Sequence, residues 1–134
     1  MKTTASNQWT AIRALAARCC FLGLMPAMAL AGCHSLHIEV AVENRTGGPI
    51  RLLEVDYPNA SFGADALGAG ATFHYRIQVQ GSGPLKVQYA GSGERQVQIQ
   101  GPALAEQQEG TLAIVLLPDG KANFEPHLSG PRNQ

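Results

Sequence analysis

The chain is predicted to fold as an all-β domain, a small immunoglobulin-like β-sandwich of about seven antiparallel strands over residues 36–125. Three observations predict this class. Apolar and polar residues alternate with period two from Leu36 onward, and no comparable period of 3.6 residues is present. Turn sequences rich in glycine and proline separate the alternating segments about every eight to twelve residues. A small open β-barrel is the alternative architecture.

The first two strands are predicted at 36–43 and 50–57, separated by the glycine pair Gly47 and Gly48. In the second strand the alternation changes phase at the adjacent residues Leu52 and Leu53, which indicates a β-bulge. Residues 57–71 lack alternation and contain three glycines, so they are predicted to be a loop or a crossover between sheets.

The clearest strand is predicted at 73–79, and shorter ones at 85–89 and 97–99 are separated from it and from each other by glycine-serine turns. We expect these three to form a meander. After a connection at 101–110, residues 112–117 are apolar on both faces, which predicts a central strand.

The C-terminal part of the domain is expected to close with a turn and a short strand. The turn Pro118-Asp119-Gly120 leads into a returning strand at 122–124. Residues 126–134 are predicted to be a flexible tail, because they are polar and contain two prolines.

The N-terminal segment 1–32 has the pattern of a signal peptide. Lys2, Arg13 and Arg18 give it a basic start, and residues 19–31 form a run of thirteen without charge. As a helix this run would be only about 20 Å long, against roughly 30 Å of hydrocarbon in a bilayer. We therefore interpret it as a targeting segment rather than a membrane span.

The sequence Leu30-Ala31-Gly32-Cys33 at the end of this segment resembles the bacterial lipobox. The resemblance implies cleavage between Gly32 and Cys33, a diacylglyceryl group on the Cys33 thiol and acylation of the new amino terminus. Residues 33–35 would then be the lipidated N-terminus and a short tether. The alternative is an ordinary secretory cleavage near Ala31, which would leave Cys33 as a free thiol.

The resemblance also implies a location in the bacterial cell envelope. Because His34, and not an aspartate, follows Cys33, the outer membrane facing the periplasm is expected, with the inner membrane and the cell surface as alternatives. The layout of residues 44–89 is likewise similar to small uncharacterised envelope lipoproteins. Membrane lipid, reached through acylated Cys33, is the first expected partner.

The composition of the processed chain excludes some functions and constrains the fold. Seven Lys and Arg residues would remain beside ten Asp and Glu, so the basic patch that nucleic-acid binding needs is absent. Two of the three cysteines lie before residue 33 and the third is Cys33 itself, which leaves none for a disulfide. Stability must then come from apolar burial.

We find no motif for catalysis, metal binding or a cofactor, and predict that the protein is not an enzyme. Hydrolase, phosphate-binding and dinucleotide-binding sequences are missing. A small metal-handling protein or enzyme is the alternative, using the strand-face groups His37, Glu39, Glu54, Asp56 and His74. A purely structural envelope protein is a third.

A flat, nearly neutral face rich in amide side chains is the main candidate binding surface. If the three strands form a meander, one of its faces carries Arg76, Gln78, Gln80, Lys86, Gln88, Gln96, Gln98 and Gln100. Amide groups lose hydration at lower cost than charged groups and can bridge to a partner directly or through water. The sequence therefore predicts a non-catalytic, lipid-anchored accessory module with an envelope protein as its further partner.

Overall fold

We describe residues 35–131 from a computed structural model of the chain; the predicted signal peptide, the predicted cleavage site and Cys33 lie outside these described residues. Eight strands are present. The strands are β1 (Ile38–Asn44), β2 (Ile50–Tyr57), β3 (Ala60–Leu67), β4 (Thr72–Ile77), β5 (Gly83–Ala90), β6 (Gln96–Leu104), β7 (Glu109–Leu117) and β8 (Lys121–Ser129). Within 35–131 no helix is long and apolar enough to cross a bilayer.

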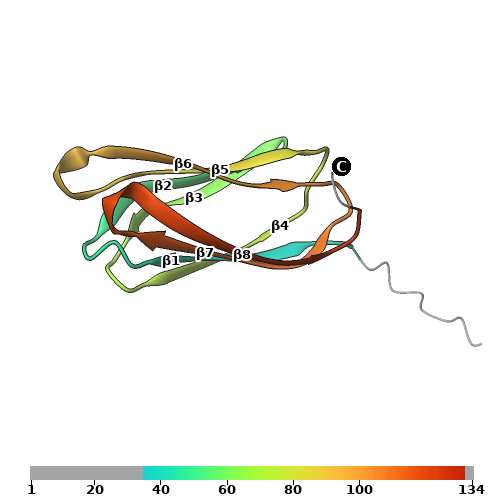
Figure 1. The fold of residues 1–134 in the computed structure, drawn as a ribbon, viewed down its shortest axis with the longest axis horizontal. Coiled ribbons are helices and arrows are strands. Elements are labelled where there is room, and N and C mark those ends of the chain that lie inside the picture. The colour runs from blue at the N-terminus through green and yellow to red at the C-terminus, as the bar shows by residue number, and fades with distance from the viewer. Residues whose placement is uncertain (1–34, 132–134) are drawn as a thin grey trace, which may run out of the picture. The chain divides into compact units, whose positions relative to one another are not determined.

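The strands form two four-stranded sheets that pack face to face, as Figure 1 shows. Sheet A has the order β4-β1-β7-β8, and sheet B has the order β3-β2-β5-β6. The predicted β-sandwich is therefore confirmed, and the barrel alternative is wrong, since no strand of one sheet is hydrogen-bonded to a strand of the other. Two details differ from the prediction: there are eight strands, and β1 pairs with β7 in parallel.

The core lies between the sheets and is built from the apolar half of each alternating segment. Val40 and Val42 of β1 lie beside Leu112 and Ile114 of β7, and all four side chains are buried. Sheet B contributes a matching layer from β2 and β5. As predicted from its two apolar faces, β7 is a central strand, with β1 on one side and β8 on the other.

The predicted bulge in β2 is present. Leu52 has a φ of 51°, and the register between β2 and β5 shifts by one residue between Arg51 and Glu54. This extra residue allows Ile50, Leu53 and Val55 all to point into the core, and leaves Leu52 61% exposed on the surface.

The loop predicted at 57–71 is wrong, because β3 occupies Ala60–Leu67. The predicted change of sheet does occur in this segment, since the chain passes from β3 in sheet B to β4 in sheet A at residues 68–71. A two-residue turn at Pro58 and Asn59 joins β3 to β2, with Asn59 in the left-handed region. Among its residues Phe62 and Leu67 are buried, while most of the others are small. Alanine fills most of the alternating apolar positions of this edge strand, so its periodicity is too weak to mark a strand in the sequence.

The predicted meander is also wrong, since β4 pairs with β1 in sheet A while β5 and β6 belong to sheet B. The chain passes from sheet A to sheet B after Ile77, and the alternation of apolar and polar residues does not indicate to which sheet a strand belongs.

At the C-terminus, the predicted tail at 126–134 begins too early, because β8 continues through Ser129 and pairs along the whole of β7.

One prediction follows from the burial of Tyr89, whose side chain is only 3% exposed. Burial raises the pKa of Tyr89 above its ordinary value, and nearby Arg95 opposes this in part. In the unfolded chain a tyrosine hydroxyl has a pKa of about 10. Because the pKa of Tyr89 is higher in the folded chain, its contribution to stability is complete below about pH 10 and is lost as the pH rises through the pKa of the folded chain. Melting temperatures measured between about pH 8 and pH 11.5 should fall more steeply for the native chain than for Tyr89→Phe; equal slopes would contradict this.

Candidate docking face

Five of the eight predicted surface residues come together on the outer face of sheet B, and we call these five the glutamine face. They are Lys86, Gln88, Gln96, Gln98 and Gln100. The register between β5 and β6 places Lys86 opposite Gln100 and Gln88 opposite Gln98. Gln88 is half-buried and the other four are exposed.

Two carboxylates of β2 border the glutamine face. Glu54 lies opposite Gln88, and the Gln88 Nε2 donates a hydrogen bond to Glu54 Oε2 at 2.8 Å. Asp56 lies opposite Lys86, so the only cation of the face has an acidic neighbour. The surface is therefore close to neutral across three strands, and the amides of Gln96, Gln98 and Gln100 are exposed to a partner.

The remaining three predicted residues lie elsewhere. Gln78 and Gln80 are in the connection between β4 and β5, and Arg76 belongs to β4 in sheet A. They are separated from the glutamine face because the meander on which the prediction relied does not form. Thus the five predicted residues that belong to one hairpin lie on one face of sheet B, and the three that were expected from a crossing strand do not lie there.

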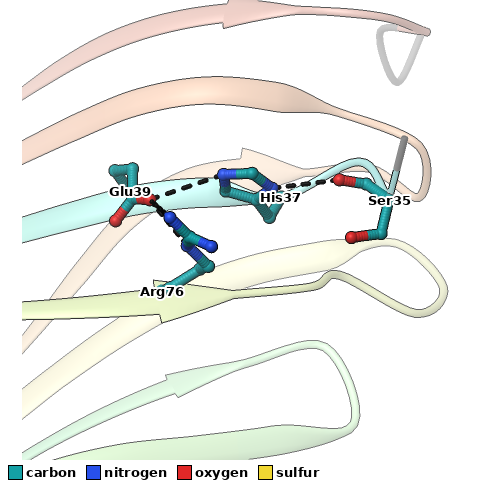
Figure 2. A network of polar contacts seen from close by, with 4 residues as sticks. All are labelled: Ser35, His37, Glu39 and Arg76. Carbon is teal, nitrogen blue, oxygen red and sulfur yellow. Dashed lines mark hydrogen bonds and ion pairs between the residues drawn. The ribbon is translucent and has the colours of Figure 1, made fainter. Parts of the chain in front are cut away.

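Arg76 is instead part of a polar network on the outer face of sheet A, shown in Figure 2. Its Nε and Nη2 both contact Glu39 Oε1 at 2.6 Å, which joins β4 to β1. On the same face of β1, His37 Nε2 lies 3.4 Å from Glu39 Oε1, and His37 Nδ1 donates to the Ser35 carbonyl at 3.0 Å. The Arg76 and Glu39 side chains are 65% and 47% exposed, so the pair contributes at most about 1 kcal/mol to stability.

The residues proposed for metal handling or catalysis are divided between the two sheets. His37, Glu39 and His74 lie with sheet A, whereas Glu54 and Asp56 lie on the outer face of sheet B. Glu39 and His74 border one apolar hollow of about 240 Å³ over Ala41 and Ala113, whose lining also includes Glu125 and His127. Among the described residues, no group of three or more His, Cys, Asp or Glu side chains could hold a metal ion.

Sequence reasoning missed two surface residues that the structure brings forward. Leu52 and Tyr75 are the large hydrophobic side chains that are exposed among residues 35–131. The bulge at Leu52 was predicted, but not its consequence, which is that the side chain turns away from the core. Tyr75 has the position of a core residue in the alternating pattern, yet its side chain is exposed because it lies on the edge strand β4.

Comparison with known proteins finds no matching family model and no matching curated protein. Among solved structures, the chain is similar to an NMR structure of a protein from Eubacterium rectale, with 10% sequence identity and a TM-score of 0.49, over 66% of this chain and 86% of the other.

Proposed function

We propose that the protein is a lipid-anchored, non-catalytic accessory module of the bacterial cell envelope that docks to another envelope protein through the glutamine face. The observation that supports the docking surface is the β5–β6 register, which aligns four glutamines and one lysine across two adjacent strands. The anchor is supported by the lipobox-like sequence that ends at Cys33. We place the module at the outer membrane, facing the periplasm.

Anchoring and docking reinforce each other in this proposal. Confinement near the bilayer raises the effective concentration of the module toward a membrane neighbour, so that a weak surface is sufficient for stable association. Amide side chains suit such a surface because they exchange hydrogen bonds with water for hydrogen bonds with the partner without removing a charge from water. No catalytic group is required.

The anchor is tested by replacing Cys33 with serine in the full-length chain. We expect the native protein to incorporate radiolabelled palmitate and to sediment with membranes, and Cys33→Ser to lose both properties, because the acceptor thiol is gone and two or more acyl chains are needed for stable binding. Cys19→Ser is the matched control and should behave like the native chain. Equal membrane retention of Cys33→Ser and the native chain would contradict the anchor.

The docking face is tested by crosslinking in intact cells. The double variant Gln98→Ala and Gln100→Ala removes two neighbouring amides from the glutamine face and should lose its crosslinked partner. A double variant at Gln78 and Gln80, also exposed glutamines but outside this face, should retain the partner. If both variants keep the same crosslinked product, docking through the glutamine face is wrong.

A further inference from the structure

The two sides of the sandwich, where the edge strands of the sheets face each other, are closed differently. On the β6 and β8 side, the Phe124 ring packs against the backbone of Gly101 so closely that an added Cβ would lie 2.7 Å from it. On the β3 and β4 side, aromatic side chains fill the space and one of them, Tyr75, is 44% exposed. We call this second side the aromatic seam.

The aromatic seam contains rings from three strands. Phe62 of β3 stacks on Tyr75 of β4 with ring centroids 4.7 Å apart and planes inclined by 12°. The ring centroids of Phe73 and Tyr57 lie 6.3 Å and 6.2 Å from that of Phe62. Stacked rings with an exposed member provide a large, rigid apolar contact area at low conformational cost.

An open hollow of about 620 Å³ lies beside these rings. Phe62 and Phe73 line it from inside the seam, while Leu52 and Ala64 line it on the sheet B side. Both of the exposed large hydrophobic side chains of residues 35–131, Leu52 and Tyr75, therefore border one place: Leu52 lines the hollow, and Tyr75 stacks on its wall. Clustering of exposed apolar groups at one site marks an interaction surface.

Beside this hollow, the outer edge of β3 has no further strand paired with it among the described residues. Strand β3 is an edge of sheet B and pairs only with β2. Asp65 is the single charged residue among its eight, whereas the edge strand β8 has two charged residues and a proline. Charges and prolines normally protect sheet edges from further pairing, so β3 is an edge that can accept another strand.

The charge around the hollow determines which strand fits. Its lining includes the carboxylates of Glu54 and Asp65, and no Lys, Arg or His among the described residues lines it. Gly63 is opposite Glu54 in the register, so no side chain of β3 separates that carboxylate from the free edge. A second copy of this chain would bring the same two carboxylates against themselves, which disfavours pairing of two β3 strands.

We infer that the β3 edge and the aromatic seam form a strand-addition site for an extended segment of another protein in which apolar or aromatic residues alternate with lysine or arginine. The apolar side chains enter the hollow beside Phe62 and Phe73, and the cationic ones reach Glu54 and Asp65 on the outer side. This site is centred on the β3 edge, shares only Glu54 with the border of the glutamine face and does not depend on the lipid anchor, so its failure would leave the proposed function standing.

The probe is a short synthetic peptide that alternates valine and phenylalanine with lysine, titrated into the isotopically labelled full-length chain. We expect amide shifts concentrated in residues 60–67, and a dissociation constant at least about tenfold larger for Asp65→Lys. Leu52→Asn should weaken binding by about fivefold while retaining the fold, because asparagine tolerates the positive φ of this position. Glu106→Lys, an exposed carboxylate in the β6–β7 connection, is the matched control and should bind as the native chain does.

Four results would overturn the inference. These are saturation by an otherwise identical peptide with glutamate in place of lysine, an unchanged dissociation constant for Asp65→Lys, shifts confined to β5 and β6, and dimerisation of the chain through β3 without peptide. Melting temperatures of each variant separate lost binding from lost folding.

Discussion

Replacing Asn44 with alanine is expected to lower the free energy of unfolding by about 3 to 5 kcal/mol, a large part of the total for a domain of this size. Asn44 is the last residue of β1 and is fully buried. Its Nδ2 donates to the carbonyl oxygens of Gly48, Leu67 and Gly68 at 2.8, 3.0 and 3.1 Å. The side chain thus joins the β1–β2 connection to the end of β3.

The other end of the Asn44 amide is equally occupied. Asn44 Oδ1 accepts hydrogen bonds from the backbone amide and the hydroxyl of Thr46, at 3.1 and 2.7 Å. Alanine would leave the backbone amide of Thr46 and the carbonyl of Leu67 without these hydrogen bonds, and a buried group left without a partner costs more than the hydrogen bond itself contributes. The Thr46 hydroxyl keeps Gly48 O within 3.0 Å, and Gly68 O keeps the amide of Ala71. Aspartate would be worse than asparagine despite equal size, because it brings an anion against three carbonyl oxygens.

The measurement is urea denaturation followed by circular dichroism on the full-length chain. Asn123→Ala is the matched control, since Asn123 is exposed on β8, and it should change the free energy of unfolding by less than about 0.5 kcal/mol. A loss at Asn44 no larger than that at Asn123 would show that the buried amide does not join these connections.

The sequence predicted the parts of the fold that depend on local periodicity. The bounds of β2, its bulge at Leu52 and the central position of β7 all follow from which residues are apolar and where the phase changes. Strand β3 was missed because alanine fills most of its apolar positions, so only Phe62 and Leu67 are large apolar residues that could mark it. The role of Asn44 could not be predicted from local sequence, because burial of its amide depends on contacts with residues 23 and 24 positions away.

The same distinction explains the candidate surface. The β5–β6 hairpin keeps Lys86, Gln88, Gln98 and Gln100 on one face, since a two-residue period is conserved through a hairpin register. Arg76 shares the period but not the sheet, because β4 pairs with β1, 37 residues away from it in sequence at Glu39. Sheet choice is set by how the whole core packs, so periodicity alone could not assign it.

Replacing Gly110 with alanine is expected to lower the free energy of unfolding by about 2 to 5 kcal/mol. The loss has two causes, an unfavourable φ and a steric overlap, and variants at two other glycines separate them. Gly110 lies in the central strand β7, between Ile38 of β1 and Leu128 of β8. Its φ of 134° is unfavourable for any residue with a Cβ, and a Cβ there would overlap the carbonyl oxygen of His127. Neither β1 nor β8 can move away without breaking pairs of sheet A.

Two matched variants isolate these causes. Gly47 has a φ of 92° with open space around it, so Gly47→Ala should lose only the conformational part, about 1 kcal/mol. Gly68 has neither a positive φ nor a neighbour within 4 Å, so Gly68→Ala should be neutral or slightly stabilising. In urea denaturation, the free energy of unfolding should therefore be lowest for Gly110→Ala, higher for Gly47→Ala and highest for Gly68→Ala. Equal losses of stability at Gly110 and Gly47 would mean that β8 shifts to make room for the added methyl group.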